Sequence, residues 1–133
     1  MARAEKALYA RLSGHAGVSA LVALRIYPAP APQGTDYPLV TYQRFGGTRY
    51  SAHGDDTGLA TALFQITSWD GEYDDAADLS TQVRLALQRY SGSEGSVTVQ
   101  ASFIENENHL FDDETRNHGV ALDVKISYVE GVT

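Results

Sequence analysis

The sequence predicts an α+β domain, in which a small, antiparallel-rich mixed sheet carries two main helices on one face and a long β-hairpin arm. Two segments, 3–13 and 73–90, repeat apolar residues every three or four positions, which is typical of helices with one buried face. Segments with strand character are 39–45, 59–69, 97–104 and 119–129. Because each main helix precedes a pair of strands, an antiparallel-rich sheet with its helices on one face satisfies the order.

Length and composition favour one soluble domain over residues 1–133. The chain has 133 residues, of which 43% are hydrophobic, and this is enough for a single core. It has no cysteine, so a disulfide framework is excluded and a reducing compartment is expected. Apolar runs such as 21–24 are far shorter than the roughly 20 residues of a membrane span. The N-terminus has no apolar core typical of a signal peptide, so we expect a cytoplasmic protein without membrane association.

The first helix is expected over 3–13, followed by a stretch that the prolines keep irregular. Its apolar face comprises Ala4, Ala7, Leu8 and Leu12. Gly14 is a plausible helix stop, and the apolar segment 18–24 adds one or two further turns. Prolines at 28, 30, 32 and 38 cannot donate to a strand ladder, so this stretch should be extended and cannot be a central strand.

The next two strands, 39–45 and 59–69, should pair through a long hairpin whose polar, glycine-bearing tip is 47–58. The helix over 73–90 follows. Its apolar stripe comprises Ala76, Leu79, Val83, Ala86, Leu87 and Tyr90. Aspartates in its first turns and arginines near its end complement the helix dipole.

The last two strands, 97–104 and 119–129, alternate apolar and polar residues with one buried face. In the first of them the apolar set comprises Val97, Val99, Ala101 and Phe103. The acidic stretch 105–117 between the strands should form a second projecting loop. Loops of about a dozen residues are usually functional or disordered, so we expect 47–58 and 105–117 to be arms that neighbours order.

The charge is acidic and unevenly distributed. The net charge is −7; residues 1–66 carry six basic and four acidic residues, whereas 67–133 carry four and thirteen. A protein that grips DNA has the opposite sign, so tight DNA binding is excluded. An acidic surface can serve solubility, and it can also let DNA pass without sticking.

Motifs for catalysis are absent, and no cofactor is expected. The sequence has no cysteine nucleophile, no nucleophile elbow and no phosphate-binding glycine loop. His109 and His118 could converge with Asp112 or Asp113 as metal ligands, although a solvated loop is the simpler interpretation. The alternatives left open are a small metal-dependent enzyme and a generic protein-binding module, each using the acidic and histidine-bearing segment 105–118. We expect no enzyme and no metal.

Landmarks along nearly the whole chain resemble one family. They are Ala7-Leu8-Tyr9-Ala10-Arg11-Leu12, Arg25-Ile26-Tyr27-Pro28, Pro32-Gln33-Gly34, Pro38-Leu39-Val40-Thr41-Tyr42-Gln43, Gln65-Ile66 with Trp69, the alanine-rich helix Tyr73–Leu87, Val97-Thr98-Val99-Gln100, Asp112-Asp113-Glu114-Thr115 and a last strand ending at Tyr128. Together and in this order they resemble the tail completion (tail terminator) proteins of long-tailed bacteriophages, which join the tail to the head.

The resemblance implies a virion structural protein without catalytic residues. It implies a ring of six copies in the tail or neck, assembled in the cytoplasm of the host bacterium. The implied partners are further copies of the chain, the major tail tube protein and a head-completion (stopper) protein, with double-stranded DNA passing non-specifically through the ring.

Ring closure requires two different patches on each subunit, and the projecting segments are the candidates for them. We assign contacts with neighbouring subunits or partners to Arg44, Phe45, Arg49, Tyr50, His53, Phe111 and Arg116. We assign the channel-facing acids to Asp55, Asp56, Asp112, Asp113 and Glu114.

Overall fold

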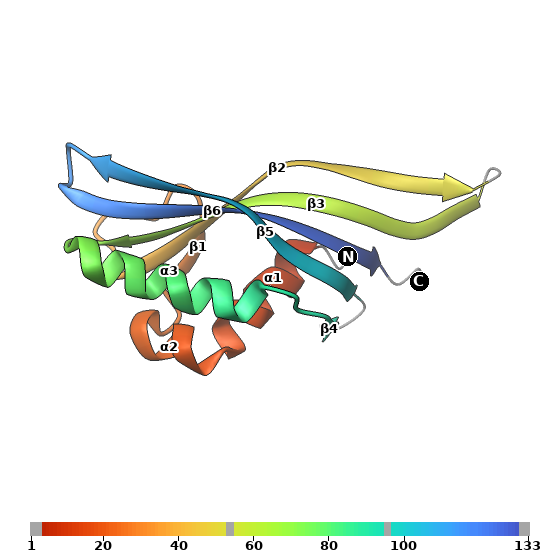
Figure 1. Ribbon diagram of the computed structural model, residues 1–133, viewed down its shortest axis with the longest axis horizontal. Coiled ribbons are helices and arrows are strands. Elements are labelled where there is room, and N and C mark those ends of the chain that lie inside the picture. Colours follow the sequence, from red (N-terminus) through yellow and green to blue (C-terminus); the bar gives the residue numbers. More distant parts are fainter. Residues whose placement is uncertain (1–3, 53–54, 95–96, 131–133) are drawn as a thin grey trace.

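Six strands form one mixed sheet, and the helices lie on one of its faces (Figure 1). The computed structural model describes residues 4–52, 55–94 and 97–130. Within these residues the strand order is β1-β2-β3-β6-β5-β4. The β1–β2 pair is parallel and the other neighbouring pairs are antiparallel. The predicted fold class, an α+β arrangement with an antiparallel-rich mixed sheet and a long hairpin arm, is confirmed.

The elements follow the predicted order, with α2 in place of the turns expected over 18–24, and two short strands, β1 and β4, are added. The helices are α1 (Ala4–Gly14), α2 (Ala16–Val22) and α3 (Tyr73–Leu87). The strands are β1 (Ile26–Pro28), β2 (Leu39–Ala52), β3 (Asp55–Asp70), β4 (Gly92–Glu94), β5 (Val97–Asp112) and β6 (Asn117–Glu130). The last predicted helix ends at Leu87 instead of residue 90, because the chain turns away at Arg89 (φ 58°), whose N–H donates to the Ser102 carbonyl at 2.7 Å.

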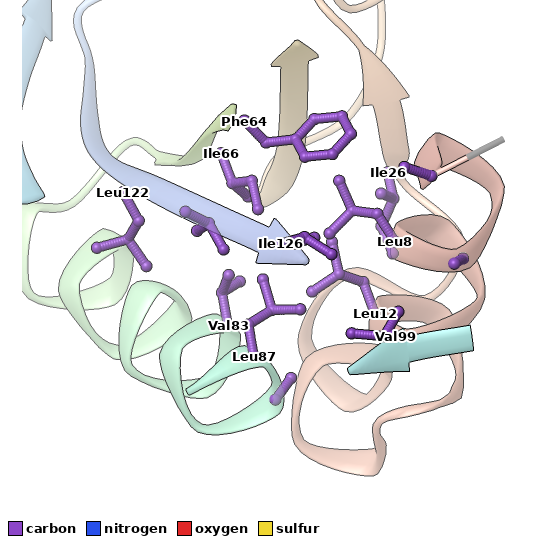
Figure 2. Packing of buried hydrophobic residues seen from close by; sticks show 14 of the residues in the cluster. Leu8, Leu12, Ile26, Phe64, Ile66, Val83, Leu87, Val99, Leu122 and Ile126 are labelled. Carbon is purple, nitrogen blue, oxygen red and sulfur yellow. The ribbon is translucent and has the colours of Figure 1, made fainter. Parts of the chain in front are cut away.

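The core lies between the helices and the inner face of the sheet (Figure 2). Alternation along β3 directs Phe64 and Ile66 toward the helices, and Ile126 does the same from β6. Leu12 of α1 and Leu87 of α3 close the core from the helical side. Since burying one such side chain fully contributes about 1.5–3 kcal/mol, this layer dominates the stability of the fold.

The proline-rich stretch behaves as its chemistry requires. Ile26–Pro28 forms only a short edge strand, β1, parallel to Val40–Tyr42 of β2. Pro28 ends the strand, and the Ala29 N–H makes the last bond of this edge, to the Tyr42 carbonyl at 2.9 Å. The prediction that the prolines stay out of a central strand is therefore confirmed.

The predicted hairpin tip at 47–58 is wrong as a loop, because most of it is strand. The ladder between β2 and β3 continues through the pairs Thr48–Thr61, Arg49–Ala60 and Ser51–Asp56. The sequence does not indicate these strand residues, because the arm extends beyond the helical layer (Figure 1). An arm without a helix against it has no need for a buried face, so apolar alternation does not mark its length.

The prediction of a loop at 105–117 is also wrong, because most of this segment is strand. β5 continues to Asp112, β6 begins at Asn117, and only a short turn joins them. The side chains from Glu105 to Phe111 are exposed, so the strand carries polar residues on both faces. Its partner β6 is buried from Gly119 to Leu122, with Val120 and Leu122 among its core residues, whereas His118 and Asp123 are partly buried.

The predicted buried face of the strand over 97–104 is correct only in its first half. Val97 and Val99 are buried, but the pairing register shifts between Val99 and Ala101. One extra residue in a strand moves every later side chain to the opposite face. Ser102 is consequently buried, and Phe103 is 47% exposed.

Candidate assembly surfaces

The root of the arm is fixed by Arg44, on the helical side of β2. Its Nη1 lies 3.4 Å from Glu5 Oε1 of α1, and its Nη2 donates to the Tyr128 hydroxyl at 3.3 Å. Burial, then the Glu5 carboxylate and Tyr9, raise the pKa of the neighbouring Tyr42 hydroxyl, which keeps it neutral. Arg44, assigned from the sequence to a partner contact, thus ties β2 to α1 within its own chain.

The face of the sheet opposite the helices, here called the open face, carries two exposed phenylalanines, one in a mixed row that crosses four strands and one beside that row. The register places Gly46, Leu63, Lys125 and Phe103 side by side across β2, β3, β6 and β5. Phe45 occupies the bulge beside this row and is 54% exposed. Two exposed phenylalanines on one sheet face are typical of a surface that another protein covers.

A shallow hollow lies beside Phe45 on the open face. It measures about 190 Å³ and is lined by Gln43, Phe45, Gln65 and Asp123. The combination of one aromatic ring, two amides and one carboxylate suits contacts with a protein surface better than it suits capture of a small molecule.

Aromatic and imidazole rings gather where β5 and β6 approach α3. Tyr73, the first residue of α3, stacks on His109 with ring centroids 5.5 Å apart and meets His118 edge-on at 5.7 Å. Phe111 lies 4.9 Å from His118, and the Arg116 guanidinium lies 5.7 Å from the Phe111 ring. This ring cluster joins two residues assigned from the sequence, Phe111 and Arg116, to the two histidines and Tyr73.

Asp112 has a different position from the other acids of the β5–β6 turn. Its Oδ1 accepts the Glu114 N–H at 3.0 Å, and its carbonyl accepts the Arg116 N–H at 2.7 Å. These bonds close the turn and hold Arg116 at a φ of 57°. Asp113 and Glu114, by contrast, are exposed and available for contacts outside the subunit.

The metal site considered from the sequence is not formed. His109 and His118 lie with Tyr73 on the helical side, and His109 Nε2 is 3.3 Å from Glu107 Oε2. Asp112 lies toward the open face, where it lines a hollow with Trp69. In the part of the chain that the structure describes, no three histidines or acids gather in a way that could hold a metal ion.

An apolar hollow of the open face is built by the proline-rich stretch. It measures about 330 Å³, and its lining comprises Ala29, Pro30, Ala31, Tyr37, Leu39, Thr41, Trp69 and Asp112. The Trp69 indole N–H donates to Thr41 Oγ1 at 3.2 Å, which fixes the ring in the wall. Trp69 itself is only partly buried.

The residues assigned from the sequence fall into two groups, one on the β2–β3 hairpin and one at the β5–β6 turn. Arg44, Phe45 and Arg49 lie on β2, whereas Phe111 and Arg116 lie at the β5–β6 turn, at the far end of the long axis (Figure 1). Tyr50, Asp55 and Asp56 lie on the arm strands, with only their backbone described, and His53 lies outside the described residues. Asp55 and Asp56 are thus far from Asp112, Asp113 and Glu114, so one subunit does not bring the two acidic groups together.

Sequence reasoning missed three contributors to these surfaces. Phe103 was assigned to the buried face of its strand because the bulge was not foreseen, and Leu63 was not among the assigned contact residues. Tyr73 was not among them either, although it is 50% exposed and contacts both histidines of the ring cluster. The sequence does contain a signal for the role of Tyr73. His109 and His118 flank the β5–β6 turn, so the pairing of these strands brings both histidines to the start of α3.

A sheet with one covered face, one open face and a projecting arm defines a subunit built for assembly. The family model for tail completion protein gp17 matches residues 6–128, and the chain belongs to this family. It is therefore a structural protein of the bacteriophage virion, located in the tail or neck, as the resemblance implied. A search of curated proteins finds no significant match.

A solved structure has the same fold. A chain of the structure described as "Virion of native gene transfer agent (GTA) particle" superposes with a TM-score of 0.64 at 20% identity. The alignment covers 93% of this chain and 92% of that one. At this identity the likeness shows the shared fold. None of the described helices is long and apolar enough to cross a membrane.

Proposed function

We propose that six copies of this chain close into a ring that ends the tail tube and joins it to the head. The partners are further copies of the chain, the major tail tube protein on one side and a head-completion (stopper) protein on the other. Double-stranded DNA passes through the opening without sequence-specific contacts. Family membership supports a role in tail completion, and the similar chain from a gene transfer agent particle supports the same fold in an assembled virion.

The observation that carries the proposal is the difference between the two ends of the sheet. At one end lies the β2–β3 arm, and at the other lie the ring cluster and the acidic turn (Figure 1). Head-to-tail rings require two unlike patches on each subunit, whereas a two-fold dimer requires one patch that matches itself. The basic excess of residues 1–66 and the acidic excess of 67–133 favour the head-to-tail arrangement.

The acidic balance suits a channel for DNA. Exposed charges act on one another within about 8 Å at physiological salt, so only side chains near the duplex affect its passage. Asp113 and Glu114 are exposed at a turn and meet this condition if the turn borders the opening. Carboxylates there would repel phosphates and keep the wall from binding DNA.

A metal-dependent enzyme is not retained as an alternative, because the family is structural and His109 and Asp112 lie on different faces of the sheet. The alternative of a protein-binding module is included in the ring proposal, because the ring binds further copies of the chain and proteins of the neck.

Imaging of the neck tests the proposal. Cryo-electron microscopy of the phage that carries this chain should show a closed ring of six copies between the tail tube and the head. Tails assembled without the chain should lack the ring and fail to join heads, and supplying the wild-type chain should restore joining. A neck in which this chain forms no ring would overturn the proposal.

A further inference from the structure

Two strand edges of the sheet remain open, one on each side. We propose that the β2 edge over 43–52 pairs antiparallel with the β5 edge over 105–112 of the next copy, so that the sheets of neighbouring subunits become continuous. The inference rests on the ring proposed above and specifies the contact that closes it. The occupant of each edge is a second copy of this chain.

The coverage of β2 stops at a definite residue. β1 pairs with β2 over Val40–Tyr42, and the Ala29 N–H adds a bond to the Tyr42 carbonyl. From Gln43 to Ala52, no strand among the described residues pairs with this side of β2. The arm also leaves the helical layer here (Figure 1), so a neighbouring strand has room to approach.

The coverage of β5 stops in the same way at the opposite edge. β4 pairs with Val97–Val99. The backbone N–H of Arg89 then donates to the Ser102 carbonyl at 2.7 Å, and the Ile104 N–H donates to Gln88 Oε1 at 2.9 Å. Beyond Ile104, the described ranges contain no strand that pairs with the outer side of β5.

Exposed edges of this length invite pairing with another chain. Natural proteins usually protect such edges with proline or lysine, with bulges or with a covering segment. Neither 43–52 nor 105–112 contains a proline or a lysine. Both open segments have a bulge near the point where coverage ends, at Phe45 or Glu105, and β2 has a second irregularity between Arg49 and Ser51. The register is constant over Gly46–Arg49 of β2 and over Asn106–Asp112 of β5.

Charge favours pairing between unlike edges. The segment 43–52 contains no acid, and of its two arginines Arg44 is paired with Glu5 of α1, whereas 105–112 contains three acids and neither arginine nor lysine. Like charges on facing strands destabilise a pair and opposite charges stabilise it, each by roughly 0.2–1 kcal/mol. Two β5 edges would repel each other, so the β2 edge is the better partner for β5.

The register fixes the direction and the stagger of the contact. β2 and β5 run antiparallel within one sheet, so a neighbour in the same orientation presents β5 antiparallel to β2. Within one copy, Asn108 lies at the level of Thr41. Placing Asn108 of the neighbour opposite Thr48 requires a shift of about seven residues, or roughly 23 Å at about 3.3 Å per residue. A constant stagger between strands is what a sheet needs in order to close into a barrel with tilted strands.

Disulfide trapping tests the pairing directly, since the chain has no cysteine of its own. The double variant Thr48→Cys with Asn108→Cys is assembled on tails and then oxidised. We expect disulfide-linked oligomers up to a closed ring, and a mixture of the two single variants should give cross-linked dimers only. The matched control combines Thr48→Cys with Thr98→Cys, because Thr98 is exposed on the same strand but lies where β4 covers the edge; it should give no cross-link.

Two further measurements keep the test decisive. Combining Thr48→Cys with Asn106→Cys or with Leu110→Cys tests registers that are shifted by two residues in either direction. In the wild-type chain, amide hydrogen exchange over 43–52 and 105–112 should slow at least about tenfold on assembly, the protection expected of new strand hydrogen bonds. A ring that forms with neither cross-links nor this protection would refute edge pairing while leaving the proposed function standing. Absence of any ring on tails would refute the proposed function itself.

Discussion

His15 lies between α1 and α2, where its imidazole gains little from the fold. It occupies the N-cap position of α2 but makes no side-chain capping bond, and its buried Nδ1 has no partner. Burial, and secondly the Arg11 charge, lower the pKa of His15 below its ordinary value of 6.5. The unfolded chain therefore binds a proton before the folded chain does. The stability linked to His15 is fully present above pH 6.5 and is lost as the pH falls toward the lowered pKa.

Replacing His15 with asparagine should stabilise the fold. Asparagine caps helices well at an extended backbone such as that of His15 (φ −82°, ψ 119°), and the gain is about 1 kcal/mol. The variant should also lose part of the fall in stability below pH 6.5. Urea unfolding at pH 5.5 and pH 8 measures both effects. His15→Ala is the control, because it removes the titration without adding a cap; an unchanged pH dependence in both variants would contradict the assignment.

Gly119 makes room for Trp69 on the open face. A Cβ atom at residue 119 would lie 2.8 Å from Cζ3 and 2.9 Å from Cε3 of the indole, closer than carbon atoms tolerate. The Trp69 ring is also held by its bond to Thr41, so it cannot move freely. Position 119 therefore requires a residue without a Cβ atom, because the Trp69 ring occupies the space that a side chain would need.

We expect Gly119→Ala to destabilise the fold by about 1–3 kcal/mol, the usual effect of overpacking. It should also shift the fluorescence of Trp69, the single tryptophan of the chain. Gly71→Ala is the matched control, because its Cβ would meet only Asn117 Oδ1, at an ordinary 3.7 Å. Equal stability and identical emission in the two variants would show that the indole is free to move aside.

At the scale of elements, apolar periodicity correctly predicted the helices and strands that pack in the core. The apolar stripe of α3 and the alternation from Val120 to Tyr128 in β6 were correctly interpreted, because both are buried in the core. Periodicity gave no length for the arm, which extends beyond the helical layer, or for the second half of β5, whose side chains from Glu105 to Phe111 are exposed. It also missed the bulge before Ala101, because one extra residue leaves the composition of a strand unchanged.

The arm can be shortened without loss of the core. The pair Arg49–Ala60 should be kept, because Ala60 is fully buried, whereas Ser51–Asp56 lies beyond it. Deleting 51–56 should leave the free energy of unfolding within about 1 kcal/mol of the parent, since shortening a surface segment changes loop entropy little. Because the arm supplies subunit contacts in the proposed ring, the shortened chain should fail to join tails to heads.

Calorimetry and complementation of phage lacking the chain measure the two effects of this deletion. Replacing 51–56 with a flexible segment of the same length is the control: it should also fail if the β2–β3 ladder beyond Arg49–Ala60 is required, and it should join tails to heads if only the length of the arm matters. Infectious particles at wild-type yield from the deleted chain would show that the arm is dispensable.

At the scale of the whole molecule, the sequence predicted the family and the class of fold but not how the surfaces combine. Family membership followed from landmarks spread along the chain, most of which lie in packed elements. Most of the assigned contact residues came from segments expected to be loops, but the structure places Arg49 and Phe111 on strands. Arg44, from an expected strand, is engaged inside its own chain. Surfaces that serve assembly are completed only by other copies, so a pattern within one chain specifies them incompletely.

The last prediction concerns the acids of the β5–β6 turn. Asp112 is unsuitable for charge reversal because its side chain closes the turn, whereas Asp113 and Glu114 are exposed. If the turn borders the DNA opening, Asp113→Lys with Glu114→Lys should leave folding intact and slow DNA ejection several-fold at low salt. Added salt should relieve the effect, since it screens charges on the wall. Asp36→Lys with Asp78→Lys makes the same charge change at exposed sites outside the turn and should eject normally. If the turn variant ejects DNA at the wild-type rate in low salt, Asp113 and Glu114 do not border the DNA opening, even if the ring itself is correct.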